Sequence, residues 1–202
     1  MPKFILGRKL GMTQVFDQKG KITPVTVIEA GPCFVVAIRT SEKHGYSALQ
    51  LNFTLKKAHK ELKKHPKKND ILLREFRLPE AEAQKYKVGD QIAVASFQEG
   101  EQVKTAGVSH GKGFQGVVKR WGFKGSPATH GHKHDERAPG SIGATFPEKV
   151  IKGMKMAGRM GGKRITAKGL TIINIDARKN LMVVKGAVPG VRGGLVEVRG
   201  EE

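Results

Sequence analysis

Three glycines form the pattern in the sequence that could bind a nucleotide cofactor. Gly111–Gly116 matches G-x-G-x-x-G, and Asp135 lies about twenty residues further on, as in a dinucleotide fingerprint. That fingerprint needs a helix that begins at the glycines, and here Gly122 and Pro127 break any helix soon after the motif. We therefore predict no cofactor. The glycines instead favour close approach of backbone N–H groups, together with Lys112, to phosphates.

A second group has the side chains of a metal site. His130, His132 and His134 alternate next to Asp135, and these residue types ligate zinc. Alternating histidines in a glycine-flanked loop lack the hydrogen bonds that orient ligands, so phosphate and base contact is the favoured role of His130 and His132. Cys33, the single cysteine, allows neither an internal disulfide nor a cysteine-based zinc site, and fits a reducing compartment. No metal site is predicted.

A third stretch superficially resembles a nucleophile elbow. Ser141 lies within Pro139–Gly143, but the spacing does not match G-x-S-x-G. No strand–turn–helix pattern surrounds it. No catalytic residue is therefore predicted, and we expect neither an enzyme nor a small-molecule substrate.

The strongest global property of the chain is positive charge. Across 202 residues, 37 Lys and Arg oppose 18 Asp and Glu, a net charge of +19. Most of it lies in two segments: fourteen basic against three acidic residues from Lys104 to Lys168, and seven lysines against Glu61 from Lys56 to Lys68. The expected partner is a nucleic acid. A membrane is not expected, because the longest apolar run, Cys33–Ile38, has six residues against the roughly twenty of a spanning helix.

Trp121 is the single tryptophan, and it is flanked by cations. A lone tryptophan usually lies in a core, but in a basic, glycine-rich segment we favour stacking on unpaired RNA bases. The lysines of segment 56–68 are expected to contact phosphates without reading sequence. The predicted RNA-binding residues are Lys112, Phe114, Lys119, Arg120, Trp121, Lys124, His130, His132, Lys133, Arg137, Lys149, Lys152, Lys155, Arg159, Lys163 and Arg164.

Outside the basic segments the sequence predicts a mainly β fold. Short stretches rich in Val, Ile and Phe alternate with turn signals such as Asp17–Gly20, as in a small barrel or sandwich. Helix patterns are confined to residues 80–85 and 56–64. The predicted strands span residues 12–16, 21–30, 33–39, 46–53, 71–77, 91–97, 170–175, 181–185 and 195–199.

Residues 109–164 have neither helical nor strand periodicity and carry twelve glycines. With little apolar content, such a stretch cannot offset its ordering entropy by itself. We expect a globular domain of residues 1–108 and 165–202, which includes basic segment 56–68. The second part is a long, basic, largely irregular loop of residues 109–164, mobile and cut first by proteases until a partner orders it.

Several linked motifs resemble the bacterial large-subunit ribosomal protein L-three family, from end to end of the chain. The longest is Gly107–Trp121. The others are Gly7–Thr13, Pro24–Ile28, Ala128–Gly131, Pro139–Gly143, Lys155–Gly158 and Val184–Gly190.

The resemblance implies a small closed β-barrel of the translation-protein type, at the surface of the large ribosomal subunit. It implies that the loop of residues 109–164 threads into 23S ribosomal RNA, with its tips near the peptidyl transferase centre. Direct RNA binding, a role in early subunit assembly, neighbouring large-subunit proteins as partners and a cytoplasmic location follow from the same resemblance. No chemistry is implied.

The sequence departs from the family pattern at three places. Lys104 stands where an acidic or amide residue is usual, and segment 56–68 is shortened. Ala144–Pro147 is one residue shorter than in many relatives and lacks the glutamine that some members methylate. That modification is not expected here.

Two other functions remain open on the residues alone. A free RNA-binding assembly or translation factor would also need a barrel and a basic segment, and co-sedimentation with mature large subunits separates the two. A nucleotide-dependent oxidoreductase would be protected from unfolding by saturating cofactor, and we expect no such protection.

Overall fold

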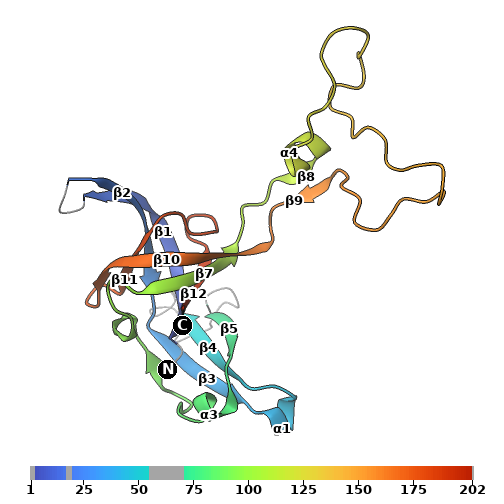
Figure 1. Cartoon of the computed structure of the whole chain (residues 1–202). Helices are drawn as coiled ribbons and strands as arrows, with labels where there is room; N and C mark the ends of the chain where they lie inside the picture. Colours follow the sequence, from blue (N-terminus) through green and yellow to red (C-terminus); the bar gives the residue numbers. More distant parts are fainter. Residues whose placement is uncertain (1–2, 17–19, 55–70, 202) are drawn as a thin grey trace, which may run out of the picture. The chain divides into compact units, whose positions relative to one another are not determined.

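The structure is a computed structural model that describes residues 3–16, 20–54 and 71–201. Basic segment 56–68 and the helix predicted in it lie outside the described residues, as does most of the turn predicted at 17–20. The mainly β prediction is confirmed, because strands make up most of the regular structure (Figure 1). The strands are β1 (Phe4–Phe16), β2 (Ile22–Ala30), β3 (Cys33–Arg39), β4 (Ala48–Thr54), β5 (Ile71–Arg77), β6 (Gln91–Ile92), β7 (Gln102–Val108), β8 (Gly113–Gln115), β9 (Gly158–Met160), β10 (Arg164–Asp176), β11 (Leu181–Lys185) and β12 (Leu195–Gly200).

The helices in the described part of the chain are short. They are α1 (Ser41–His44), α3 (Glu80–Ala83), α4 (Val117–Trp121) and a 3-10 turn, η1 (Val94–Ser96). Among the described residues, none of these helices has the length and apolar character that crossing a membrane requires.

The chain divides into two compact units, which we call the barrel unit and the basic unit. The barrel unit comprises Met1–Val108 and Arg164–Glu202, and the basic unit comprises Ser109–Lys163. Arg164 is the first residue of β10, so it belongs to the barrel unit rather than to the predicted loop.

Six strands of the barrel unit pair in a closed ring, in the order β1-β12-β7-β10-β11-β2. Every neighbouring pair is antiparallel. Closure gives each strand two hydrogen-bonded neighbours, so no backbone edge of this sheet is left unpaired. Side chains on alternate positions point inward, and Ile172, Val184 and Val198 are fully buried there.

A second sheet packs against the barrel. Its strand order is β5-β4-β3-β6. Phe4 on β1 stacks on Phe76 of β5 with ring centroids 4.8 Å apart, and one continuous core contains residues of both sheets. Burial of such aromatic and branched side chains is the main stabilising contribution to a fold of this size.

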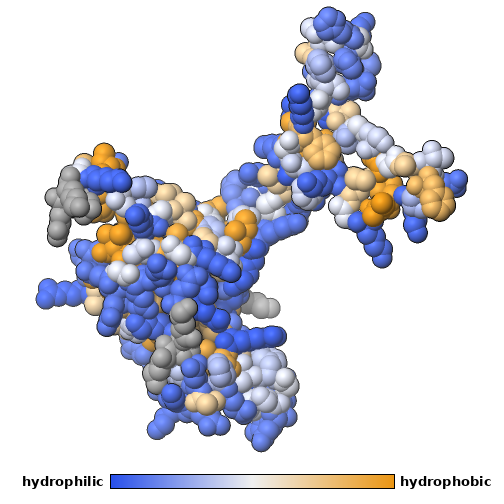
Figure 2. Space-filling view, in the orientation of Figure 1, coloured by the Kyte–Doolittle hydropathy of each residue, from blue (hydrophilic) through white to orange (hydrophobic). Residues whose placement is uncertain are grey.

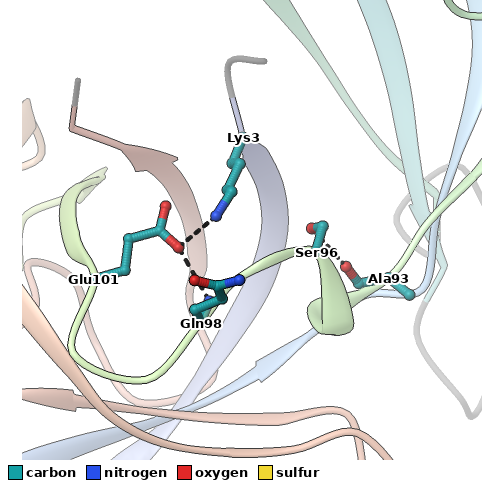
Figure 3. A network of polar contacts seen from close by, with 5 residues as sticks. All are labelled: Lys3, Ala93, Ser96, Gln98 and Glu101. Atoms are coloured by element: carbon teal, nitrogen blue, oxygen red, sulfur yellow. Dashed lines mark hydrogen bonds and ion pairs between the residues drawn. The ribbon is translucent and has the colours of Figure 1, made fainter.

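A network of polar contacts lies beside the start of β1 (Figure 3). Lys3 Nζ donates to Glu101 Oε2 at 2.8 Å, and the Gln98 N–H donates to the same oxygen at 3.0 Å. The Gly200 N–H donates to the Lys3 carbonyl at 2.8 Å. These bonds join the first described residue to the turn before β7 and to the end of β12.

Several predicted strand boundaries were wrong. β1 begins at Phe4 rather than at residue 12. Its first four residues are all buried, so they lack the alternation of apolar and polar residues from which a strand is predicted. β7 was not predicted, since its Lys, Ala and Gly have low strand propensity and it forms by pairing with β10 and β12. The strand predicted at 91–97 is only the two-residue β6, followed by η1.

Candidate nucleic-acid interface

The two ends of the basic unit are joined by a short antiparallel ladder, where β8 pairs with β9. The Ser109 N–H donates to the Lys163 carbonyl at 2.9 Å, and the Lys112 N–H donates to the Met160 carbonyl at 2.9 Å. Residues 109–164 were predicted to be largely irregular. The ladder and α4 are regular elements that the sequence did not predict, because three-residue strands and a single helical turn show no periodicity.

Helix α4 follows directly from the glycine motif and ends after five residues. Gly122 terminates it in the left-handed conformation, with φ 75°, and donates its N–H to the Val118 carbonyl. Part of the motif, Gly113–Gln115, is strand β8. A dinucleotide fingerprint needs a long helix whose N-terminus faces a pyrophosphate, and this one-turn helix does not provide one.

Trp121 is held beside the returning chain. Its Nε1–H donates to the Met156 carbonyl at 2.8 Å, and an Arg120 guanidinium N–H donates to the same oxygen at 2.6 Å. The Arg120 guanidinium lies 5.0 Å from the indole centroid and Lys155 Nζ lies 5.9 Å from it. The indole is 43% exposed and is not part of the hydrophobic core. Its ring therefore has a fixed polar edge, two neighbouring cations and accessible surface.

A loop crossing forms a hollow in the basic unit. The Ser126 N–H donates to the Glu136 carbonyl at 3.1 Å. Gly125 has φ 74°, and a Cβ there would collide with that same carbonyl, so the crossing requires glycine. The hollow has a volume of about 710 Å³. It is lined by Phe123, Lys124, Gly125, Ser126, His132, Asp135, Ala138, Pro139 and Gly140.

Charge and exposure set the basic unit apart. It carries eleven Lys and Arg against three Asp and Glu, a net charge of +8. None of these cations has an ion pair with another described residue. All the predicted RNA-binding side chains within it are exposed except Arg120 and His132, which are half-buried. Arg164, in the barrel unit, is the remaining predicted residue, and its guanidinium pairs with Glu197 Oε2 at 2.5 Å.

Exposed apolar side chains accompany the cations, and Figure 2 shows apolar and hydrophilic surface side by side on this unit. Phe114 is 77% exposed, and Phe146, which the sequence reading did not select, is 88% exposed. Ile151 and Met154, also missed, alternate with Lys149, Lys152 and Lys155. The signal that could have found them is this alternation of apolar and basic residues. Such a surface suits a partner that offers both phosphates and flat apolar bases.

The alternating histidines lie between Thr129 and Arg137, with His130 and His134 exposed and His132 half-buried beside the hollow. Among residues 3–16, 20–54 and 71–201, no group of three or more His, Cys, Asp or Glu side chains is arranged to hold a metal ion.

Comparisons with known proteins identify the family. A family model described as Ribosomal protein L3 matches residues 78–181, which include the whole basic unit. The large ribosomal subunit protein uL3 of Herpetosiphon aurantiacus is 49% identical over 199 residues, covering 96% of this chain and 94% of that protein. The uL3 proteins of Thermobifida fusca and Carboxydothermus hydrogenoformans are 48% and 46% identical, each over 98% of this chain and over 94% and 97% of their own lengths. The chain belongs to the ribosomal protein L3 family.

Membership confirms the resemblance drawn from the motifs. A member of the L3 family is a ribosomal protein and not an enzyme. The glycine motif and the alternating histidines therefore need a role that involves no catalysis.

Proposed function

We propose that the chain is a structural constituent of the large ribosomal subunit that binds 23S ribosomal RNA directly through its basic unit. It supports early subunit assembly and organises RNA near the peptidyl transferase centre. The barrel unit is a barrel of the translation-protein type at the subunit surface, and neighbouring large-subunit proteins contact it in the cytoplasmic ribosome.

One observation carries the proposal: the basic unit has a net charge of +8 with no internal ion pair and only one buried side chain, Val117. Unpaired cations that repel one another and apolar surface in contact with water both destabilise a protein segment. RNA offers phosphates that pair with the cations and bases that cover the apolar side chains. One partner therefore accounts for both features.

The elements of the basic unit have distinct roles in this binding. Lys149, Lys152 and Lys155 contact backbone phosphates. Phe146, three residues before Lys149, stacks on a base, and Ile151, between Lys149 and Lys152, enters an RNA groove. The hollow beside Phe123 has one aromatic wall and polar groups, which suits a single base turned out of its stack.

The test compares two charge-matched triple variants of the full chain in binding to transcribed 23S ribosomal RNA. Lys149→Gln, Lys152→Gln and Lys155→Gln together remove three exposed lysines from the basic unit. We expect weaker binding and a log–log salt slope that is shallower by about 2 to 3, since each lost phosphate contact removes about 0.7 to 0.9. The measurement is the Kd over a series of salt concentrations.

The control removes the same charge from the barrel unit. Lys43→Gln, Lys85→Gln and Lys87→Gln together replace three exposed lysines of that unit. We expect little change in the salt slope. Equal losses in the two triple variants would mean that binding follows net charge alone and would contradict the proposal.

A further inference from the structure

A hollow on the outer face of the barrel unit gathers cations from separate strands. It has a volume of about 240 Å³. The residues that line it are Glu75, Phe76, Lys104, Ala106, Arg164, Thr166, Glu197 and Arg199. None of the cations among them except Arg164 was predicted from the sequence to bind RNA.

Strand register places these side chains on one face. Lys104 on β7 is directly opposite Arg199 on β12, and Ala106 is opposite both Glu197 and Thr166. Directly opposed residues of an antiparallel pair share a face. The intervening residues, such as Thr105 and Val198, are fully buried. The cations therefore lie on the outer surface of the barrel because the inward positions alternate with them.

The carboxylates near the hollow are already engaged. Glu197 receives two guanidinium groups, with Arg164 at 2.5 Å and Arg74 Nε at 3.4 Å. Lys104 Nζ is 3.6 Å from Glu201. Glu75 accepts a hydrogen bond from the Tyr46 hydroxyl at 2.8 Å.

Arg199 is the cation left over. Its guanidinium lies 5.5 Å from the centroid of the Phe76 ring, and it has no ion pair with another described residue. It also stands opposite Lys104, and like charges directly opposite each other destabilise a sheet. Five cations, Arg39, Arg74, Lys104, Arg164 and Arg199, thus meet three nearby carboxylates, because Glu75 pairs with Arg39 at 3.4 Å and Glu197 and Glu201 pair with the others except Arg199.

We propose that this hollow binds one backbone phosphate of ribosomal RNA, between Lys104 and Arg199. A phosphate offers several acceptor oxygens, so it can receive hydrogen bonds from the ammonium and the guanidinium at once. The buried ring of Phe76 beside the site lowers the local dielectric and strengthens the attraction. The bound anion also removes the repulsion between the two opposed cations. This inference rests on the proposed function, because it takes RNA as the partner, and adds a contact outside the basic unit.

The experiment measures binding of the full chain to transcribed 23S ribosomal RNA over a series of salt concentrations. The double variant Lys104→Gln and Arg199→Gln should weaken binding and make the log–log salt slope shallower by about 0.7 to 0.9, the value for one phosphate. Arg199→Lys retains the charge and should retain the slope. The control, Lys43→Gln with Lys85→Gln, removes the same charge from exposed positions elsewhere on the barrel unit and should leave the slope unchanged.

Thermal unfolding separates a binding role from a structural one. Lys104→Gln alone removes the repulsion across the two strands together with the part-exposed pair with Glu201, and such pairs contribute little net stability. Its Tm should therefore stay near the wild-type value, although its salt slope should become shallower. If Tm falls while the salt slope stays at the wild-type value, the cations only support the fold and the proposal is wrong. If the Lys104→Gln and Arg199→Gln double variant has the same salt slope as the Lys43→Gln and Lys85→Gln control, the phosphate site is also ruled out. That result is expected if the hollow binds an acidic protein instead of RNA.

The basic-unit triple variant distinguishes this failure from failure of the proposed function. If the triple variant weakens RNA binding and the Lys104 and Arg199 variants do not, only the phosphate site is lost. If neither set changes RNA binding, the proposed function itself fails.

Discussion

The barrel unit and the basic unit hold their conformations by different means. Every residue of the continuous hydrophobic core lies in the barrel unit, where paired strands bury side chains such as Ile5, Leu49 and Val196 completely. The basic unit, fully described, has Val117 as its single buried residue. Its local shape comes from backbone hydrogen bonds, a one-turn helix and glycine-dependent turns.

This difference shows which part of the chain can be stable alone. Burial of apolar surface is the main term that offsets conformational entropy, and the barrel unit has it. Backbone hydrogen bonds exposed to water contribute little net stability, so we expect the basic unit to depend on a partner for most of its order. Variants that separate fold stability from RNA binding therefore test the comparison.

The largest expected effect is on the fold. Leu49→Ala on β4 removes a fully buried side chain and should lower the free energy of unfolding by about 2 to 5 kcal/mol. Phe146→Ala, at an 88% exposed position of the basic unit, should change it by less than about 0.5 kcal/mol. Chemical denaturation measures both. Similar losses in the two variants would mean that the basic unit shares the cooperative core.

A smaller effect is expected for Trp121, and it should appear in binding rather than in folding. Trp121→Ala removes the indole that donates to Met156, and it should weaken binding to 23S ribosomal RNA by about 1 to 3 kcal/mol if one base stack is lost. The unfolding free energy of the barrel unit should stay nearly constant. Because Trp121 is the sole tryptophan, its emission should also shift when RNA is added.

A core tryptophan would behave in the opposite way. It would emit as a buried indole before RNA is added, and its truncation would cost about 3 to 5 kcal/mol in folding stability. Trp121→Phe is the matched variant, since it retains an aromatic face and loses the N–H that binds the Met156 carbonyl.

The smallest effect is the pH dependence of folding stability that the buried thiol of Cys33 causes in the barrel unit. Burial raises the pKa of its thiol from 9.0 to about 12. The folded state therefore keeps the proton to higher pH than the unfolded chain does. Stability that is complete below pH 9.0 should be lost progressively as the pH rises towards about 12.

The Cys33 contribution is isolated by comparison with Cys33→Ala. At one pH unit above the unfolded pKa, the wild type should have lost about 1 kcal/mol more than the variant, relative to neutral pH. Denaturant unfolding at the two pH values measures this loss. Parallel pH profiles of the two proteins would show that the thiol is not buried as described.

The sequence predicted correctly those strands whose local residue pattern alone indicates strand. Strands β3, β5 and β11 have the predicted bounds, because each is a compact run of strand-forming residues. Strand β7 could not be predicted, since its Lys104, Ala106 and Gly107 become strand only through pairing on both sides. Gly107 is needed there because a Cβ would meet the Pro189 carbonyl oxygen at 2.6 Å, a contact that no local pattern reveals.

In the candidate interface, too, local features could be predicted and contacts between distant residues could not. Glycine and charge content predicted where the exposed cations lie, because composition is local. The contact of Arg120 and Trp121 with the Met156 carbonyl joins residues about 35 positions apart, and the hollow beside Arg199 needs the register of three strands. Neither can be read from spacing along the chain.

Hydrogen exchange of the full chain, free and bound to 23S ribosomal RNA, tests the central claim most directly. The amides of β2 and β11, which are neighbouring strands of the barrel sheet, should be protected in both states. Amides of residues 122–157 should exchange rapidly in the free protein and become protected on RNA. Equal exchange of residues 122–157 with and without RNA would contradict the account.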